Sequence, residues 1–364
     1  MVSGAPPRRK VSIVTSQLVD SVLSTAILSL GVEYRSRAKL PPATDEWWFT
    51  VLGIAQFGLG PAPLEVAHVP VAAVPLRPLG GEDALYEIWR TDGTLRAGRL
   101  ESVQFRCNEQ LLFGCVTVPG SQEANANGAI EAATATAYAQ VFATLETTGY
   151  RQLVRIWNYV PAINQPAEVG ERYWLFNHAR HEAFVAFRRP IPEAVPAASA
   201  VGTQPSSPLV VYFLATRTSP QMLENPRQVS AYRYPTQYGP CSPTFSRAAL
   251  LADGGGTLLT SGTASIVGHA TVHPGNAAAQ TRESLTNISM LVDVANARLP
   301  TRLALESLTY KVYVRNAADL PAVAEAMRAK IGHSAQVVYL SADICRRDLL
   351  VEMEAVGSGQ RCRP

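Results

Sequence analysis

Residues 341–356 read SADICRRDLLVEMEAV, and the second half of this stretch alternates regularly in side-chain character. The odd-numbered positions of 349–355 are apolar, whereas Glu352 and Glu354 share the opposite face, which is the period of a half-buried β-strand. Cys345 precedes the first of these glutamates by seven residues. A carboxylic acid that faces a cavity beside a thiol is suited to acid catalysis. The same pattern also fits the solvated face of an edge strand, and this segment alone leaves both interpretations open.

The composition is that of an ordinary globular protein with enough residues for one large domain or two. The chain has 364 residues, of which 47% are hydrophobic and 17% are charged. Its net charge is only +3 and it contains no dense basic stripe, so nucleic-acid binding is not expected. Five widely spaced cysteines, an odd number, favour reduced thiols and a cytoplasmic location.

The N-terminal region combines a short basic start with an apolar segment. Residues 8–10 read RRK, and we expect them to lie in a disordered terminus. Residues 11–32 are largely apolar, but Gln17, Asp20 and several Ser and Thr interrupt them. The segment is therefore expected to form buried strand and loop rather than a membrane span or a signal-peptide core.

Strand and helix patterns occur twice in the same order along the chain. Residues 111–160 are expected to form a strand, then a helix that ends at Gly149, then a second strand. Residues 257–315 repeat this order with similar lengths. We therefore predict an α+β fold built from two fused units, each a mixed, curved β-sheet with helices packed on one face.

The expected domain boundaries follow from composition. Residues 1–190 are assigned to a first unit with a strand-rich extension. Residues 191–208 read IPEAVPAASAVGTQPSSP, and this density of proline and small residues is typical of a linker. Residues 209–356 are assigned to the second unit, and residues 357–364 to a loose tail.

Short motifs in the second unit resemble those of the YjgF-like (Rid-type) deaminase superfamily, and they occur in the same order. They are Ser261-Gly262, Gln280-Thr281, Asn287, TYKVYVRNAADLPAV and LLVEMEAV. The whole chain resembles the chorismatase family, which is related to those deaminases. The segments that carry this second resemblance are LVRIWNYVPAIN, YGPCSPTFSRA, SGTAS and ICRRDLLVEMEAV. The resemblance implies two YjgF-like units, with the catalytic residues in the second.

The chorismatase resemblance also implies an activity: a cofactor-free enzyme that releases pyruvate from chorismate. The type that forms 3-hydroxybenzoate, in some cases with 4-hydroxybenzoate, has a cysteine seven residues before its catalytic glutamate and a glycine in the SGTAS region. Cys345, Glu352 and Gly262 occupy these positions. The expected products are therefore 3-hydroxybenzoate and pyruvate, for aromatic secondary metabolism. The alternatives are hydrolysis to 3,4-dihydroxycyclohexa-1,5-diene carboxylate, Rid-type imine deamination, and binding of a small molecule without catalysis.

This chemistry sets requirements for the surrounding side chains. Protonation of the enolpyruvyl methylene carbon requires Glu352 to retain its proton near neutral pH, so its pKa must be raised by burial and by nearby carboxylates. The two carboxylates of chorismate call for arginines. Arg155 lies mid-strand among aromatic residues, and it either binds the substrate or forms an internal salt bridge. Arg217 and Arg247 flank an aromatic loop, and each has a structural role as its alternative.

Tyr212 is a further candidate for substrate binding, with packing in the core as its alternative. No metal site is expected, because the pairs His178/His181 and His269/His273 have no Cys or carboxylate at ligand spacing. No P-loop and no GxGxxG motif occurs, so no nucleotide cofactor is expected either. The fusion of two units favours a monomer whose partner is its small-molecule substrate.

Overall fold

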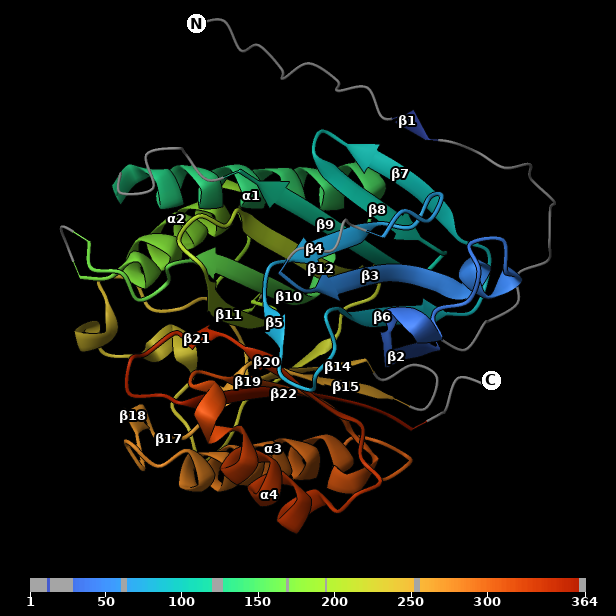
Figure 1. The fold of residues 1–364 in the computed structure, drawn as a ribbon. Helices are drawn as coiled ribbons and strands as arrows, with labels where there is room; N and C mark the ends of the chain where they lie inside the picture. Colours follow the sequence, from blue (N-terminus) through green and yellow to red (C-terminus); the bar gives the residue numbers. More distant parts are fainter. Residues whose placement is uncertain are drawn as a thin grey trace, which may run out of the picture.

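Two β-sheets face each other at the centre of the protein, and each is covered on its outer side by two helices (Figure 1). The computed structural model describes residues 12–13, 29–59, 64–119, 127–167, 170–193, 195–251 and 256–359. The expectations for the basic start and for most of residues 11–32 concern residues outside these ranges. No helix within them is long and apolar enough to cross a membrane.

The first central sheet has the strand order β1-β7-β8-β9-β12-β10-β11-β21. Its helix α1 (Asn127–Thr148) ends where Gly149 adopts a φ of 79°, a left-handed conformation that favours glycine and ends a helix. Helix α2 (Arg172–Ala186) packs beside α1 on the same face. The strands are β1 (Ser12–Ile13), β7 (Arg96–Leu100), β8 (Val103–Cys107), β9 (Leu111–Val118), β10 (Gln152–Pro161), β11 (Ala197–Thr203), β12 (Leu209–Thr216) and β21 (Asp343–Ile344).

The second central sheet has the order β13-β14-β15-β22-β19-β20-β5, with β16 paired to β22. Its outer face is covered by α3 (Ala277–Asn296) and α4 (Leu320–Ile331), which pack on a core of Leu, Ile and Val side chains. The strands are β5 (Arg77–Pro78), β13 (Gln221–Leu223), β14 (Ala248–Leu251), β15 (Thr257–Thr260), β16 (Thr263–Ala264), β19 (Thr309–Val314), β20 (Val337–Ser341) and β22 (Val351–Ser358).

The two sheets share one connectivity. In the first, β12 lies between β9 and β10, and β11 runs parallel beside β10. In the second, β22 lies between β15 and β19, and β20 runs parallel beside β19. The long helices α1 and α3 occupy equivalent places in the two series. This repeat confirms the predicted α+β fold of two units, each with helices on one face of a mixed sheet.

A third sheet, of order β2-β6-β3-β4, closes one side of the two central sheets (Figure 1). It packs against β8, β9 and β12 of the first sheet and against β22 of the second. Its strands are β2 (Leu30–Ser36), β3 (Val51–Phe57), β4 (Val71–Val74) and β6 (Leu85–Thr91). The remaining short elements are the hairpin β17 (Ile266–Val267) and β18 (Ala270–Thr271) and the 3₁₀ turns η1 (Arg37–Lys39), η2 (Glu46–Thr50), η3 (Ala231–Arg233), η4 (Thr236–Tyr238), η6 (Leu305–Ser307) and η7 (Ala317–Asp319).

Three boundaries differ from the sequence-based expectation. Residues 197–203 of the predicted linker form β11, which is buried and pairs with β10 on one side and β21 on the other. The prolines of this segment lie before and after the strand, where they cost no ladder hydrogen bond, and its small residues fit a strand covered on both faces. Residues 209–216 form β12 of the first sheet, not the second. Residues 357–358, expected in the tail, continue β22.

Candidate active site

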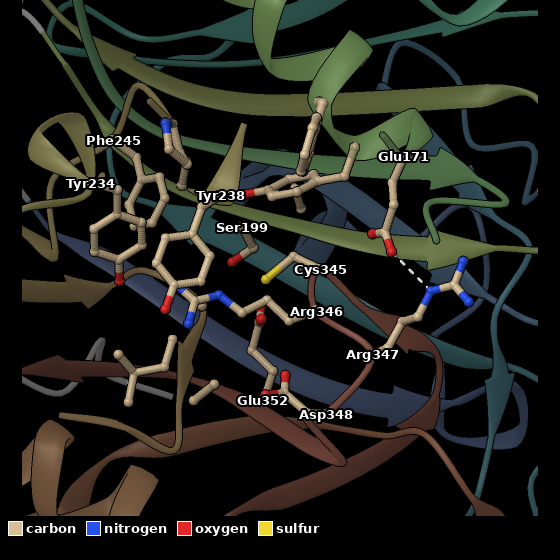
Figure 2. Close-up of a pocket in the computed structure, with 18 of the residues that line it drawn as sticks. Glu171, Ser199, Tyr234, Tyr238, Phe245, Cys345, Arg346, Arg347, Asp348 and Glu352 are labelled. Atoms are coloured by element: carbon tan, nitrogen blue, oxygen red, sulfur yellow. Dashed lines mark hydrogen bonds and ion pairs between the residues drawn. The ribbon is translucent and has the colours of Figure 1, made fainter. Parts of the chain in front are cut away.

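A cavity of about 340 Å³ lies where the end of β11 in the first sheet meets the β21–β22 loop and β22 (Figure 2). It is mixed in character, because aromatic side chains and arginines line it together with Cys345 and Glu352. Figure 2 shows Tyr234, Tyr238 and Phe245 gathered on one side of this space. The lining residues come from positions 171–180, 198–200, 234–247, 262–266 and 345–352.

Glu352 is the buried carboxyl group of this cavity. The strand period of β22 directs it inward, and only 4% of its surface is exposed. Within the described part of the chain its carboxyl oxygens make no hydrogen bond or ion pair, so they are available to a ligand in the cavity. Burial raises the pKa of Glu352 to about 8, the charge of Glu354 adds to the rise, and Arg155 and Arg315 oppose it. Glu352 is therefore an acid that keeps its proton at neutral pH.

Glu354 shares the face of Glu352 but has the opposite environment. Its carboxylate lies 3.2 Å from the guanidinium of Arg155 and 3.2 Å from Lys311 Nζ, and it accepts hydrogen bonds from Trp157 and Tyr313. Burial alone would raise the pKa of Glu354, but Lys311 and Arg155 lower it below its ordinary value. Sequence periodicity could not distinguish the two glutamates. In the structure Glu352 is an acid without a hydrogen bond among the described residues, Glu354 is a paired carboxylate, and both are buried.

Lys311 extends this charged cluster to the third sheet. Its Nζ lies 2.6 Å from the carboxylate of Glu87 on β6 and donates to Tyr212 Oη at 2.9 Å. Glu87 also accepts hydrogen bonds from Tyr34, Trp89 and Tyr212. We call Glu87, Arg155, Lys311 and Glu354 the buried charge cluster; it contains two cations and two carboxylates. Its members come from all three sheets.

Gly262 and Cys345 flank the Glu352 carboxyl group. A Cβ atom at position 262 would lie 2.0 Å from Glu352 Oε1, so the absence of a side chain there makes room for the carboxyl group. Cys345 stands in the β21–β22 loop and lines the same cavity. Burial raises the pKa of Cys345 to about 12, and the nearby Glu352 contributes to the rise. The sulfur is therefore a thiol, not a thiolate, at neutral pH.

Three arginines of the cavity wall have N–H groups without an acceptor in the described residues: Arg180 and Arg247 at Nε, and Arg346 at Nη2. The guanidinium of Arg346 lies 3.8 Å from the ring centroid of Tyr238, and its Nη1 donates to the backbone oxygen of His269. Arg247 donates to Tyr234 Oη. These contacts fix the guanidinium groups in the cavity wall, where their positive charge favours an anion.

Comparisons with known proteins agree with this geometry. Residues 87–215 match the family model described as "Chorismatase FkbO/Hyg5-like, N-terminal". The 3-hydroxybenzoate synthase of Streptomyces hygroscopicus is 38% identical over 281 residues, which cover 74% of this chain and 80% of that protein. The chain belongs to the chorismatase family. A second chorismatase, from Streptomyces rapamycinicus, is 38% identical over 284 residues, covering 76% of this chain and 83% of its own.

A chorismatase crystal structure extends the likeness to the whole fold. It aligns with a TM-score of 0.81 at 31% identity, over 92% of this chain and 100% of its own. The alignment therefore spans both units of this chorismatase and the sheet that closes them. The family recognised from the sequence is confirmed, and with it the classification of the chain as an enzyme.

The cavity of this chorismatase contains some of the site residues expected from the sequence and excludes others. Glu352, Cys345, Gly262 and Arg247 line it together. Arg155 instead forms the internal salt bridge to Glu354, which was its alternative. Two further candidates, Tyr212 and Arg217, also lie outside the cavity wall.

Tyr212 and Arg217 have structural partners. Tyr212 is buried between the sheets, where it bonds Glu87 and Lys311, because its strand position faces the second sheet. Arg217 is exposed at the end of α1, where it donates to the backbone oxygen of Glu109 and lies 4.1 Å from the ring centroid of Tyr150. Arg155, Tyr212 and Arg217 therefore do not line this cavity, and their contact with substrate stays a prediction.

The sequence analysis missed Arg180 and Arg346. Arg346 follows Cys345 directly in the segment ICRRD, so its proximity to the acid strand was a usable signal. Arg180 lies within α2, and no local pattern marks it as a cavity residue. Among the described residues, no three His, Cys, Asp or Glu side chains are grouped as a metal would require. His178 pairs with Glu131 and His273 with Glu283.

Proposed function

We propose that this chorismatase converts chorismate into 3-hydroxybenzoate and pyruvate. The observation that carries the proposal is the Glu352 carboxyl group, which is buried, has a pKa raised to about 8, faces a cavity and has no hydrogen-bond partner among the described residues. An enol ether is cleaved by protonation of its terminal carbon, and a carboxylic acid that stays protonated at neutral pH is the group that this step needs.

The cavity suits a small dianion with a planar ring. Its volume of about 340 Å³ lies at the lower end of the range typical of small-molecule sites. The positively charged side chains of Arg180, Arg247 and Arg346 line the cavity and match the charge of two carboxylates. The rings of Tyr234 and Tyr238 supply apolar surface for the cyclohexadiene ring.

The proposed reaction begins with proton transfer from Glu352 to the enolpyruvyl methylene carbon. The methylene becomes a methyl group, and the ether carbon becomes an oxocarbenium ion stabilised by the carboxylate left on Glu352. The ring hydroxyl then attacks the neighbouring ring carbon, the bond from that carbon to the ether oxygen breaks, and pyruvate leaves. The hydroxyl proton returns to Glu352, and the arene-oxide-like ring opens to 3-hydroxybenzoate. The two products together contain all the atoms of chorismate, so no water is consumed.

Water is the competing nucleophile, and Cys345 is placed to limit it. Attack of water on the oxocarbenium ion gives the dihydroxy diene acid and pyruvate instead. The protonated thiol of Cys345 occupies the cavity wall near Glu352, where it fills space that a water molecule would need. In this proposal the thiol acts through its volume and weak hydrogen bonding and does not act as a nucleophile.

The direct test is incubation with chorismate, followed by pyruvate detection with lactate dehydrogenase and product identification by NMR. An aromatic phenol in equal amount to pyruvate supports the proposal. A diene diol in equal amount to pyruvate supports the hydrolytic chorismatase instead. Binding of chorismate without pyruvate release indicates a binding protein and refutes both enzymatic assignments.

Replacing Cys345 with alanine is expected to divert product from 3-hydroxybenzoate to the diene diol. The smaller side chain opens room for water beside the oxocarbenium ion while Glu352 still delivers its proton. The product ratio at fixed chorismate turnover, measured by NMR, checks this expectation. Cys241→Ala is the matched control, because Cys241 is also a free thiol but does not line the cavity. An unchanged ratio in Cys345→Ala removes the proposed role of the thiol.

The kcat/KM of the enzyme is expected to fall at alkaline pH as Glu352 loses its proton. The acid form is active, and its pKa is raised to about 8, so the value is highest below this pH and declines above it. Glu354→Gln removes the charge that helps to hold the proton, so the alkaline limb moves to lower pH. Glu325→Gln, a change on the exposed face of α4, serves as the control. If kcat/KM declines at the same pH in Glu354→Gln as in the unchanged enzyme, the charge of Glu354 does not raise the pKa of Glu352, and this explanation is contradicted.

A further inference from the structure

Arg315, directly after β19, donates hydrogen bonds from every N–H group of its side chain, to β21, to the β21–β22 loop and to Asn164. Its Nε donates to the backbone oxygen of Leu349 at 2.8 Å. Its Nη1 donates to Asn164 Oδ1 at 3.0 Å and to Asp343 Oδ1 at 2.6 Å. Its Nη2 donates to the backbone oxygens of Ile344 and Arg346, both at 2.9 Å. A guanidinium has five N–H groups, and all of them are used here.

The two bonds from Nη2 bracket Cys345. One accepting carbonyl is that of Ile344, in the peptide group directly before Cys345, and the other is that of Arg346, in the next peptide group but one, so one nitrogen atom holds the backbone on both sides of Cys345. The backbone N–H of Arg315 donates to Leu350, which fixes the end of the same loop. Arg315 itself does not line the cavity, whereas Cys345 and Arg346 do.

The loop between Ile344 and Val351 contains no strand or helix of its own. Its carbonyl groups must therefore find donors outside regular secondary structure, and charged donors form the stronger hydrogen bonds. On the other side of the loop, Gln280 of α3 bonds the backbone of Asp348 and Leu350. Lysine cannot replace Arg315, because an ammonium group has three donors and lacks the planar fork that reaches these acceptors.

We propose that Arg315 is a positioning residue that sets the product ratio, because it holds Cys345 in the cavity wall where the thiol limits access of water. The inference rests on the proposed function for its catalytic readout. In this proposal the product ratio depends on the hydrogen bonds between Arg315 and the β21–β22 loop, which lie outside the cavity, as well as on Cys345, which lines it.

The test uses Arg315→Lys in the full-length enzyme, with total pyruvate and the ratio of diene diol to 3-hydroxybenzoate measured together. We expect the ratio to rise at least about tenfold, because lysine loses more than one of these hydrogen bonds and a single charged one already corresponds to about that factor, while pyruvate release persists. In the double variant with Cys345→Ala, the shift is expected to equal that of Cys345→Ala alone, because both changes act through one side chain. An unchanged ratio in Arg315→Lys, or fully additive shifts, overturns the proposal.

A second measurement does not depend on turnover. Alkylation of Cys345 by iodoacetamide, followed by peptide mass spectrometry, is expected to be about tenfold faster in Arg315→Lys, since a partly buried thiol becomes more accessible when its loop opens. If the unsubstituted protein forms no 3-hydroxybenzoate, the proposed function fails, and the labelling rate still decides whether Arg315 positions Cys345.

Two further variants keep the test decisive. Asp343→Ala removes one acceptor of Arg315 from a half-exposed side chain, so it is expected to fold and to shift labelling in the same direction by a smaller factor. Arg328→Lys alters an exposed ion pair on α4 and is expected to leave labelling and product ratio unchanged. Labelling that is unchanged in both Arg315→Lys and Asp343→Ala overturns the proposal.

Discussion

Glu352→Gln is expected to slow pyruvate release from chorismate by roughly two to four orders of magnitude, the range contributed by a positioned general acid. Glutamine has the same size but no carboxylic proton to transfer to carbon. Because the carboxyl group of Glu352 makes no hydrogen bond within the described residues, the amide leaves no protein donor without its partner. The variant is therefore expected to fold with nearly unchanged stability and to keep binding chorismate.

The measurement is pyruvate formation at saturating chorismate, together with chorismate binding by isothermal titration calorimetry. Glu325→Gln is the matched control, because Glu325 lies on the exposed face of α4 and pairs only with Arg328. Its turnover is expected to equal that of the unchanged enzyme. Glu352→Gln turnover within about tenfold of the unchanged enzyme would be too fast for the loss of a general acid, and it would remove Glu352 from the mechanism.

Lys311→Met is expected to lower the free energy of unfolding by about 3–5 kcal/mol, the usual cost of removing one partner of a buried ion pair. Lys311 is the cation shared by Glu87 and Glu354, at 2.6 Å and 3.2 Å. Without it, the buried charge cluster retains two carboxylates and only Arg155 as a counter-ion. Methionine fills a similar volume, so the loss measures charge and not packing.

Urea unfolding followed by tryptophan fluorescence measures this difference. Lys330→Met on α4 is the control, because Lys330 is exposed and its replacement is expected to change stability by no more than about 0.5 kcal/mol. A loss below about 1 kcal/mol in Lys311→Met would mean that the carboxylates take up protons or water at little cost, contrary to the pairing described above.

Local pattern predicted the architecture because the fold repeats. Short-range periodicity predicts the order strand, helix, strand in residues 111–160 and 257–315, and the structure contains this order in both units. The third sheet was not recognised as a separate element, since its strands have no counterpart in the repeat. Prolines suggested a linker at 191–208, yet they only delimit β11, whose small residues are selected by burial between neighbouring strands.

The site was predicted in part for a related reason. Alternation on β22 left Glu352 and Glu354 equivalent, and the resemblance to the chorismatase family selected Glu352, Cys345 and Gly262, all of which line the cavity. The alternation of residues along a strand shows which side chains share a face of the sheet, but it does not show which element packs against that face. Arg155 was placed on a face with its aromatic neighbours, and that face meets Glu354 of the other sheet instead of the cavity. Arg346 and Arg180 reach the cavity only through the tertiary packing of a loop and a helix.

The origin of the buried charge cluster from three sheets limits how this protein can be divided. The second repeat supplies a balanced pair, Lys311 and Glu354, whereas the first repeat supplies Arg155 alone and the closing sheet supplies Glu87 alone. Exchange of the first unit or of the closing sheet with that of a relative would therefore separate Arg155 or Glu87 from its counter-ion. The duplicated architecture is visible in the fold, but modularity has been lost, and successful chimaeras must transfer the cluster as a whole.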